Sequence, residues 1–182
     1  FVAKSRKYDS ARAMALSGNH IPEEVYDNLV ATVRKQAGPL QEYVTLRKEV
    51  LGLEEIHFSD LFVPIVPGID RTYTYEEAQN IVLEATAVLG EDYTAVLKEA
   101  FDNRWIDVYQ NVGKRSGAYS SDTYDTHPFV LLNYNDTLDN MFTLAHEMGH
   151  AMHSYLSNKA QPFIYAEYKI FVAEVASTCN EI

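Results

Sequence analysis

The sequence predicts a mainly α-helical protein with one small antiparallel β-hairpin. Apolar residues recur every three or four positions through most of the 182 residues, which is the period of an amphipathic helix. Glycine and proline follow several of these segments, as they commonly do where helices end. Only residues 113–135 combine glycines, tyrosines and a short apolar run in the manner of strands.

The composition narrows the class of protein. Hydrophobic residues make up 47% and charged residues 23% of the chain, which is typical of an ordinary folded protein. The net charge of −11 disfavours a nucleic-acid partner, which would attract a basic surface. No apolar run approaches the roughly 20 residues that span a bilayer, so no membrane partner is expected. One cysteine excludes an internal disulfide and favours the cytoplasm.

Two helices are predicted in the first third of the chain. Residues 22–37 carry Val25, Leu29 and Val33 at a spacing of four, so one face of this helix is apolar. Residues 39–51 have a similar pattern. These segments indicate a helix pair whose apolar faces are available for packing.

An extended connection and two more helices complete the region before residue 113. Residues 57–70 are rich in proline, valine and isoleucine and lack a helical period, which predicts an extended segment. Thr74 and Glu77 form a capping box, and the helix that they start is expected to reach Gly90. A further helix is expected over residues 92–104. Residues 1–112 are therefore predicted to be a helical region.

Residues 113–135 are predicted to form the hairpin. Its strands are expected at about 116–121 and 129–134, the second containing the apolar run from Phe129 to Leu132. The first strand offers Gly117, Ala118 and Tyr119 as an edge against which an extended peptide could pair its backbone.

The last region, residues 136–182, is predicted to be a helix pair over about 137–156 and 163–181. The first of these helices contains His-Glu-Met-Gly-His at 146–150, an H-E-x-x-H motif. Residues four apart lie about 40° apart around a helix, so His146 and His150 can bind one zinc ion together. Glu147 lies about 100° round, close enough to hold a water on the metal.

The pattern of this helix supports the metal interpretation. The two histidines fall on the side of the helix opposite an apolar seam, and a histidine pair away from the core is hard to explain as packing. The stretch 119–150 contains five carboxylates and no lysine or arginine, a local field that favours a divalent cation. The seam consists of Met141, Leu144, Met148, Ala151, Met152 and Tyr155.

A catalytic zinc needs a third protein ligand and an open position. Position 156 is Leu156, so the motif has no histidine at the extended spacing. The next helix offers Glu174, which lies among apolar residues and would need a partner if it were buried.

At these residues the chain resembles the thimet-oligopeptidase-like family of zinc metallopeptidases. Thr143 to Tyr155 looks like the active-site helix of that family, and Phe171 to Glu181 is similar to the segment that supplies its third ligand. Gly113 to Ser120, Pro128 to Tyr134 and the helical stretch from Tyr8 to Leu53 match the family as well. The resemblance thus covers nearly the whole chain and implies a zincin-like helical catalytic region.

The resemblance implies a role for each motif residue. His146, His150 and Glu174 would bind one zinc ion per chain, and Glu147 would be the general base in the hydrolysis of internal bonds of short peptides. Ser177, Thr178 and Glu181 would lie beside the ligands and orient them.

The resemblance also implies that residues 1–182 are a partial catalytic domain, truncated at both ends relative to the family. We expect such a fragment to have little or no peptidase activity and to self-associate through apolar surface. An alternative interpretation is a non-catalytic helical module that binds peptides or has a structural role and retains the zinc motif.

Overall fold

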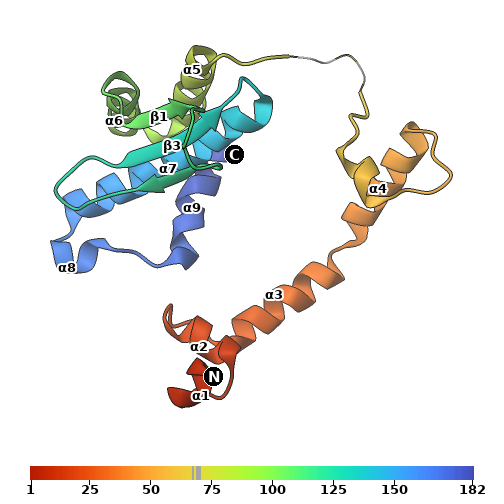
Figure 1. The fold of residues 1–182 in the computed structure, drawn as a ribbon, viewed down its shortest axis with the longest axis horizontal. Helices are drawn as coiled ribbons and strands as arrows, with labels where there is room; N and C mark the ends of the chain where they lie inside the picture. The colour runs from red at the N-terminus through yellow and green to blue at the C-terminus, as the bar shows by residue number, and fades with distance from the viewer. Residues whose placement is uncertain (67, 69–70) are drawn as a thin grey trace. The chain divides into compact units, whose positions relative to one another are not determined.

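The computed structural model describes residues 1–66, 68 and 71–182, which are helical for most of their length (Figure 1). The chain divides into two compact units, Phe1–Asp70 and Arg71–Ile182. The mainly helical class predicted from the sequence is confirmed in both units.

The first unit contains four α-helices and one 3₁₀ helix within its described residues. The predicted helices at 22–37 and 39–51 are confirmed as α3 and α4, whereas the prediction of an extended segment over 57–70 is wrong at Phe58–Phe62, which form the 3₁₀ helix η1. Residues 67, 69 and 70 of that segment lie outside the described residues. The bounds are α1 (Val2–Ser5), α2 (Ala11–Ser17), α3 (Glu23–Lys35), α4 (Gly38–Val50) and η1 (Phe58–Phe62).

The described part of the first unit buries almost none of its apolar side chains. Val25, Leu29 and Val33 form the apolar stripe of α3, yet they are 43–61% exposed. Among the described residues of this unit the one buried side chain is Arg47, whose guanidinium donates to the carbonyl of Asp60 at 2.9 Å and so links α4 to η1. The apolar face predicted for α3 therefore exists but has no partner within the described residues of its own unit.

The second unit begins with helices that cover one side of a small sheet. Thr74 caps α5 through the predicted capping box, in which its hydroxyl accepts from the backbone N–H of Glu77. The predicted helix from 74 to 90 is divided into an α-helical and a 3₁₀ part, and α6 follows Gly90, which has a φ of +103°. The bounds are α5 (Tyr75–Ala85), η2 (Thr86–Leu89) and α6 (Glu91–Asp102).

The sheet has three strands rather than the two that the sequence predicts. The antiparallel hairpin is confirmed as β2 (Tyr119–Ser121) and β3 (Phe129–Tyr134), with Tyr119 opposite Leu131. The prediction of a helical region over residues 1–112 misses one strand, because β1 (Ile106–Tyr109) pairs parallel to β3 and completes the order β1-β3-β2. Four residues are too short for a period of two to stand out in a sequence.

The C-terminal helices differ in length from the prediction. The motif-bearing helix α7 (Leu138–Ala160) begins at the Thr137 cap and runs four residues past the expected end at 156. The expected helix over 163–181 is broken into α8 (Phe163–Ala166) and α9 (Ile170–Glu181). Tyr168 lies in the break, where its hydroxyl is 2.8 Å from the Ser154 Oγ and its ring stacks on His153 of α7.

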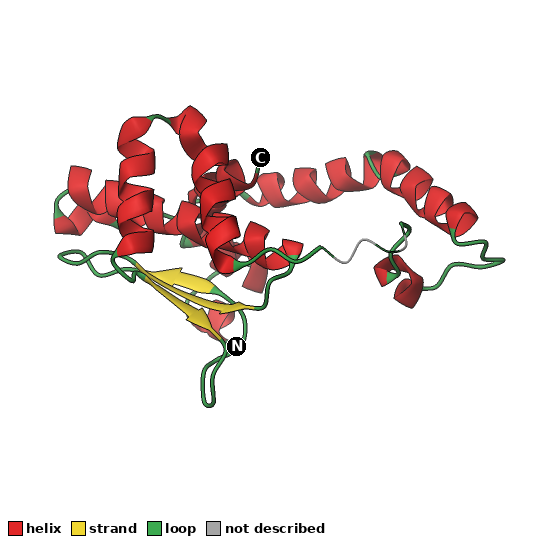
Figure 2. Cartoon of the chain, turned by 90° about the horizontal axis from the view of Figure 1, so that it is seen from above, coloured by secondary structure: helices red, strands yellow, loops and turns green. Residues whose placement is uncertain are grey.

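The core of the second unit lies between the sheet and the helices α5, α6 and α7 (Figures 1 and 2). The predicted seam of α7 supplies much of it: Leu144, Met148 and Ala151 are completely buried. Trp105 stands between α6 and β1, is 4% exposed and stacks on His127. This core fixes α7 beneath the sheet and leaves its histidine side for other contacts. None of the helices in the described ranges has the length and apolar character needed to cross a membrane.

Candidate functional site

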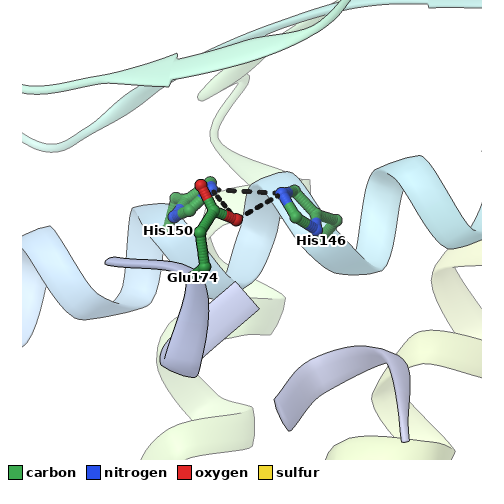
Figure 3. Close-up of side chains that lie close together, drawn as sticks. All are labelled: His146, His150 and Glu174. Carbon is green, nitrogen blue, oxygen red and sulfur yellow. Dashed lines mark hydrogen bonds and ion pairs between the residues drawn. The ribbon is translucent and has the colours of Figure 1, made fainter. Parts of the chain in front are cut away.

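The candidate ligands come from two helices that pack against each other, α7 and α9 (Figure 3). His146 and His150 project from α7 on the side away from its buried seam, as the sequence predicts. The Nε2 atoms of the two histidines are 3.1 Å apart, and Glu174 Oε2 lies 3.4 Å from the first and 3.6 Å from the second. The structure thus brings the three candidate ligands to one point.

This donor set fits a zinc ion. Ligand atoms about 2.0–2.1 Å from a tetrahedral zinc lie about 3.4 Å from one another, which is close to the three separations observed. The Nδ1 of His146 is 2.5 Å from the Glu181 carboxylate, to which a ring N–H donates. The Nε2 of a neutral His146 therefore carries a lone pair, and it faces another ring nitrogen and a carboxylate oxygen. Such a set of electron-pair donors could hold a cation between them.

Glu174 occupies the expected place on α9. Its side chain lies beside apolar residues of the sequence, as expected, but it is 56% exposed and not buried. Its apolar neighbours on α9, Phe171 and Val175, are exposed as well. Ser177, which is completely buried, donates its hydroxyl to Glu174 Oε2 at 3.0 Å and holds the carboxylate toward the histidines.

The three residues expected beside the ligands have different surroundings. Ser177 contacts Glu174, and Glu181 contacts His146, so both touch a candidate ligand. Thr178 is exposed and lines an apolar cavity along α9 and η2, and within the described residues its hydroxyl makes no hydrogen bond to any of the three candidate ligands. The geometry therefore favours two of the three residues for an orienting role.

Glu147 lies next to this cluster and is only 7% exposed. Burial raises the pKa of its carboxyl group, while the neighbouring His146 and the backbone of Ser120 act in the opposite direction. Its Oε2 atom has no hydrogen-bond partner among the described residues. A buried carboxylate with one free oxygen and a raised pKa is suited to exchange a proton with a bound molecule.

Within the described residues, the strand β2 forms one of the two edges of the sheet. Gly117 and Ala118 precede it and line a cavity of about 270 Å³ together with Asp139 and Thr143 of α7. Gly117 has a φ of +90°, a conformation that side chains disfavour, and this turn directs the chain into the strand. The predicted peptide-binding residues Gly117, Ala118 and Tyr119 thus lie along an edge that neighbours α7.

Two residues not predicted from the sequence hold the loop before this edge. The Lys114 side chain, although charged, is 3% exposed, and it donates to the carbonyls of Asp107 and Tyr109 at the end of β1. Asn133 of β3 donates to the carbonyls of Arg115 and Gly117. The loop between β1 and β2 is therefore fixed from both neighbouring strands.

The close packing of α7 and α9 depends on Gly149. A Cβ atom at this position would lie 2.6 Å from the Cα of Ser177 and 2.8 Å from the carbonyl oxygen of Ala176. Both contacts are with backbone atoms, which cannot rotate away. The absence of a side chain at Gly149 therefore allows α9 to approach α7 and bring Glu174 to the histidines.

A hydrogen-bonded pair outside the predicted set also joins the two helices. Asn180 of α9 is 6% exposed and donates to the carbonyl of Ala145, and Tyr93 of α6 donates to Asn180 Oδ1. The signal in the sequence is the helical spacing of small or polar residues at Ala173, Ser177 and Asn180, which are the buried residues of α9.

The fold and the site together resemble a known class of peptidases. Residues 2–182 match Peptidase family M3, and the chain belongs to that family. It is 54% identical over 181 residues to Oligopeptidase PepF of Bacillus subtilis (strain 168), covering 100% of this chain and 27% of that protein. It is 49% identical over 181 residues to Group B oligopeptidase PepB of Streptococcus agalactiae, covering 100% of this chain and 30% of that protein.

Solved structures agree with the fold. A crystal structure of a Chlamydophila abortus protein, 44% identical in sequence, superimposes with a TM-score of 0.81. The match covers 98% of this chain and 30% of that protein's chain. Oligoendopeptidase-F from Enterococcus faecium, 35% identical, has a TM-score of 0.55 and covers 98% of this chain and 23% of its own. The chain therefore spans less than a third of the length of these relatives.

We predict that Gly149→Ala separates α7 from α9, because the new methyl group would overlap backbone atoms of Ala176 and Ser177. Overpacking of this kind typically costs about 1–3 kcal/mol in the free energy of unfolding, measured by urea denaturation. Gly38→Ala in α4 is the control, because no atom lies within 4 Å of its added Cβ. Equal stability of the two variants would contradict the importance of the close approach.

Proposed function

We propose that this chain carries the zinc centre of an endopeptidase that hydrolyses internal bonds of short peptides. The observation that carries the proposal is the convergence of His146 Nε2, His150 Nε2 and Glu174 Oε2, with mutual distances of 3.1–3.6 Å, beside the buried carboxyl group of Glu147. Membership of Peptidase family M3 supports a peptidase reaction. Two histidines and one glutamate are a donor set typical of catalytic zinc.

When bound, zinc would lower the pKa of a bound water and polarise the carbonyl of the scissile bond. Glu147 would accept a proton from the attacking water at its carboxylate and deliver it to the nitrogen of the leaving amine. Burial, which raises the pKa of Glu147, makes it a stronger base and brings its pKa closer to neutral pH. Burial lowers the pKa of His150, which favours the neutral form that a ligand requires.

The substrate would lie as an extended strand along the edge formed by Gly117, Ala118 and Tyr119. Backbone pairing gives affinity with little dependence on side chains, which suits an enzyme that accepts many peptides. The backbone of Ser120 acts on Glu147, so the edge strand and the proposed base are neighbours. The names of the relatives, an oligopeptidase and an oligoendopeptidase, support short peptides as the substrate class.

The alternative is a helical module that binds zinc or peptide without turnover. The fully formed set of candidate ligands and the free oxygen of Glu147 favour catalysis. The variants of Glu147 described below distinguish the two functions, because a binding module does not require a base.

We also propose a reducing compartment, the cytoplasm, as the site of action. The single cysteine, Cys179, is free and exposed on α9 and would be open to oxidation elsewhere. Fractionation of cells followed by immunoblotting tests this proposal, and recovery outside the cytoplasm would contradict it.

We predict that the chain binds about one zinc ion and that His146→Ala abolishes tight binding, because only two candidate ligands remain. Metal content after dialysis, measured by inductively coupled plasma mass spectrometry, checks the result. His57→Ala is a matched control, since its side chain is 72% exposed and lies outside the cluster. Undiminished zinc in His146→Ala would rule out the ligand assignment.

We predict that Glu147→Gln retains zinc but loses peptide hydrolysis by a factor of about 10² or more, because the amide cannot accept the proton of water. The assay uses a chimera in which these residues replace the matching segment of the Bacillus subtilis relative, and fluorogenic peptides as substrate. Glu84→Gln in α5, which lies outside the candidate site, is the control. Activity of the Glu147→Gln chimera close to that of the parent chimera would exclude Glu147 as the base. We expect the 182-residue chain on its own to hydrolyse little peptide.

We propose that the chain self-associates through the exposed apolar side chains of α9 and η2. Phe171, Val175 and Val88 are 61–87% exposed and line one cavity of about 840 Å³. We predict that Val175→Glu shifts the chain toward the monomer in size-exclusion chromatography with light scattering, whereas Val112→Glu, at an isolated exposed position, does not. A monomeric parent chain at all concentrations would contradict the proposal.

A further inference from the structure

We propose that Asn180 is a positioning residue of the metal centre, which fixes α9 in register with α7 and so holds Glu174 opposite the two histidines. Asn180 contacts none of the three candidate ligands and acts through the helices that carry them. The inference rests on the proposed zinc function, which it deepens by naming the group that sets the geometry of the site.

The hydrogen bonds of Asn180 connect its own helix, α9, to two others, α7 and α6. Its Nδ2 donates to the carbonyl oxygen of Ala145 at 3.1 Å, and its Oδ1 accepts from the hydroxyl of Tyr93 at 2.7 Å. Ala145 is the residue before His146, so this bond joins α9 to the backbone that bears the first candidate ligand. With 6% exposure, the amide of Asn180 has both of its polar atoms paired and is shielded from competing water.

The helix α9 makes its most extensive contacts with α7, and a directional bond within that contact can set the register between the two helices. The buried residues of α9 are Ala173, Ser177 and Asn180, so the contact face is made of small or polar side chains. Phe171 and Val175, the large apolar residues near Glu174, are exposed and do not hold the helix in place. A shift by one residue moves a helix by about 1.5 Å and turns it by about 100°, which would remove Glu174 from the cluster.

Gly149 and Asn180 have different effects on the same interface. Gly149 permits the close approach, because a Cβ atom there would meet the backbone of Ser177 at 2.6 Å. The absence of a side chain, however, does not select one position along the helix axis. The bond from Asn180 to Ala145 is directional and, together with the bond between Glu181 and His146, selects that position.

Tyr93 determines which way the amide of Asn180 faces. Its hydroxyl donates to Oδ1, and this leaves the NH₂ group facing the Ala145 carbonyl. A carboxylate at position 180 would instead place an oxygen against that carbonyl oxygen. Asn180→Asp is therefore nearly isosteric but replaces the attraction between the helices by repulsion.

The test measures the zinc dissociation constant of the 182-residue chain by competition with a chromogenic chelator. We expect Asn180→Asp to weaken zinc binding by about tenfold or more, the usual size of the effect when a group supporting a ligand is lost. Tyr93→Phe should weaken binding less, because the amide keeps its bond to Ala145 but can turn. Asn111→Asp, at an exposed position without such bonds, is the control for added charge and should leave the affinity unchanged.

The direction of the effect separates positioning from charge. An added carboxylate near a cation strengthens binding through charge alone, so a fall in affinity for Asn180→Asp cannot arise from electrostatic attraction. Visible spectra of the Co²⁺-loaded chains give a second readout, and we expect the tetrahedral signal of the parent to weaken in Asn180→Asp. Melting temperatures of the metal-free chains show whether each variant is folded. If Asn180→Asp does not fold, the zinc affinity of Tyr93→Phe still decides the question.

Three outcomes are distinguishable. Weaker zinc binding and an altered cobalt spectrum in folded Asn180→Asp or Tyr93→Phe would support the inference. Parent-like affinity and spectrum in both variants would overturn it while leaving the zinc function intact. Absence of zinc binding by the parent chain would instead overturn the proposed function itself, and this inference with it.

Discussion

The site depends on the contact between α7 and α9, because neither helix carries a complete set of candidate ligands. The positions of His146 and His150 follow from the placement of α7, whose apolar seam is buried in the core beneath the sheet. Glu174 is secured only through its helix, whose large apolar residues are exposed. The geometry therefore rests on the interface between α7 and α9, in which Gly149 allows the close approach and hydrogen bonds from Ser177, Glu181 and Asn180 fix the positions of the ligands.

The local parts of the site could be predicted from the sequence because they depend on helical spacing. The positions of His146, Glu147 and His150 on one helix follow from their separation alone, and the buried seam follows from the apolar period. The Thr74 capping box and the hairpin could be predicted for the same reason, since each is made by residues close together in the sequence.

The non-local parts could not be predicted in this way. β1 pairs with β3 in parallel, a partnership between Ile106 and Val130 that no short pattern encodes. The exposure of Glu174 depends on which residues surround α9. The break before α9 depends on the contacts that Tyr168 makes with Ser154 and His153 of α7. The role of Lys114 in holding the loop between β1 and β2 could not be predicted either, because its hydrogen-bond acceptors are backbone carbonyls of β1.

The two unspecified positions of the H-E-x-x-H motif are under opposite constraints in this protein. Met148 is completely buried and faces the core, where volume is needed, whereas Gly149 faces the backbone of α9, where none is available. The two positions should thus tolerate mutation differently. Replacement of Met148 by another aliphatic residue is acceptable, whereas any side chain added at Gly149 is harmful. Four of the five consecutive residues are constrained by chemistry or by the neighbouring helix, and the fifth by the core, so the motif has no free position.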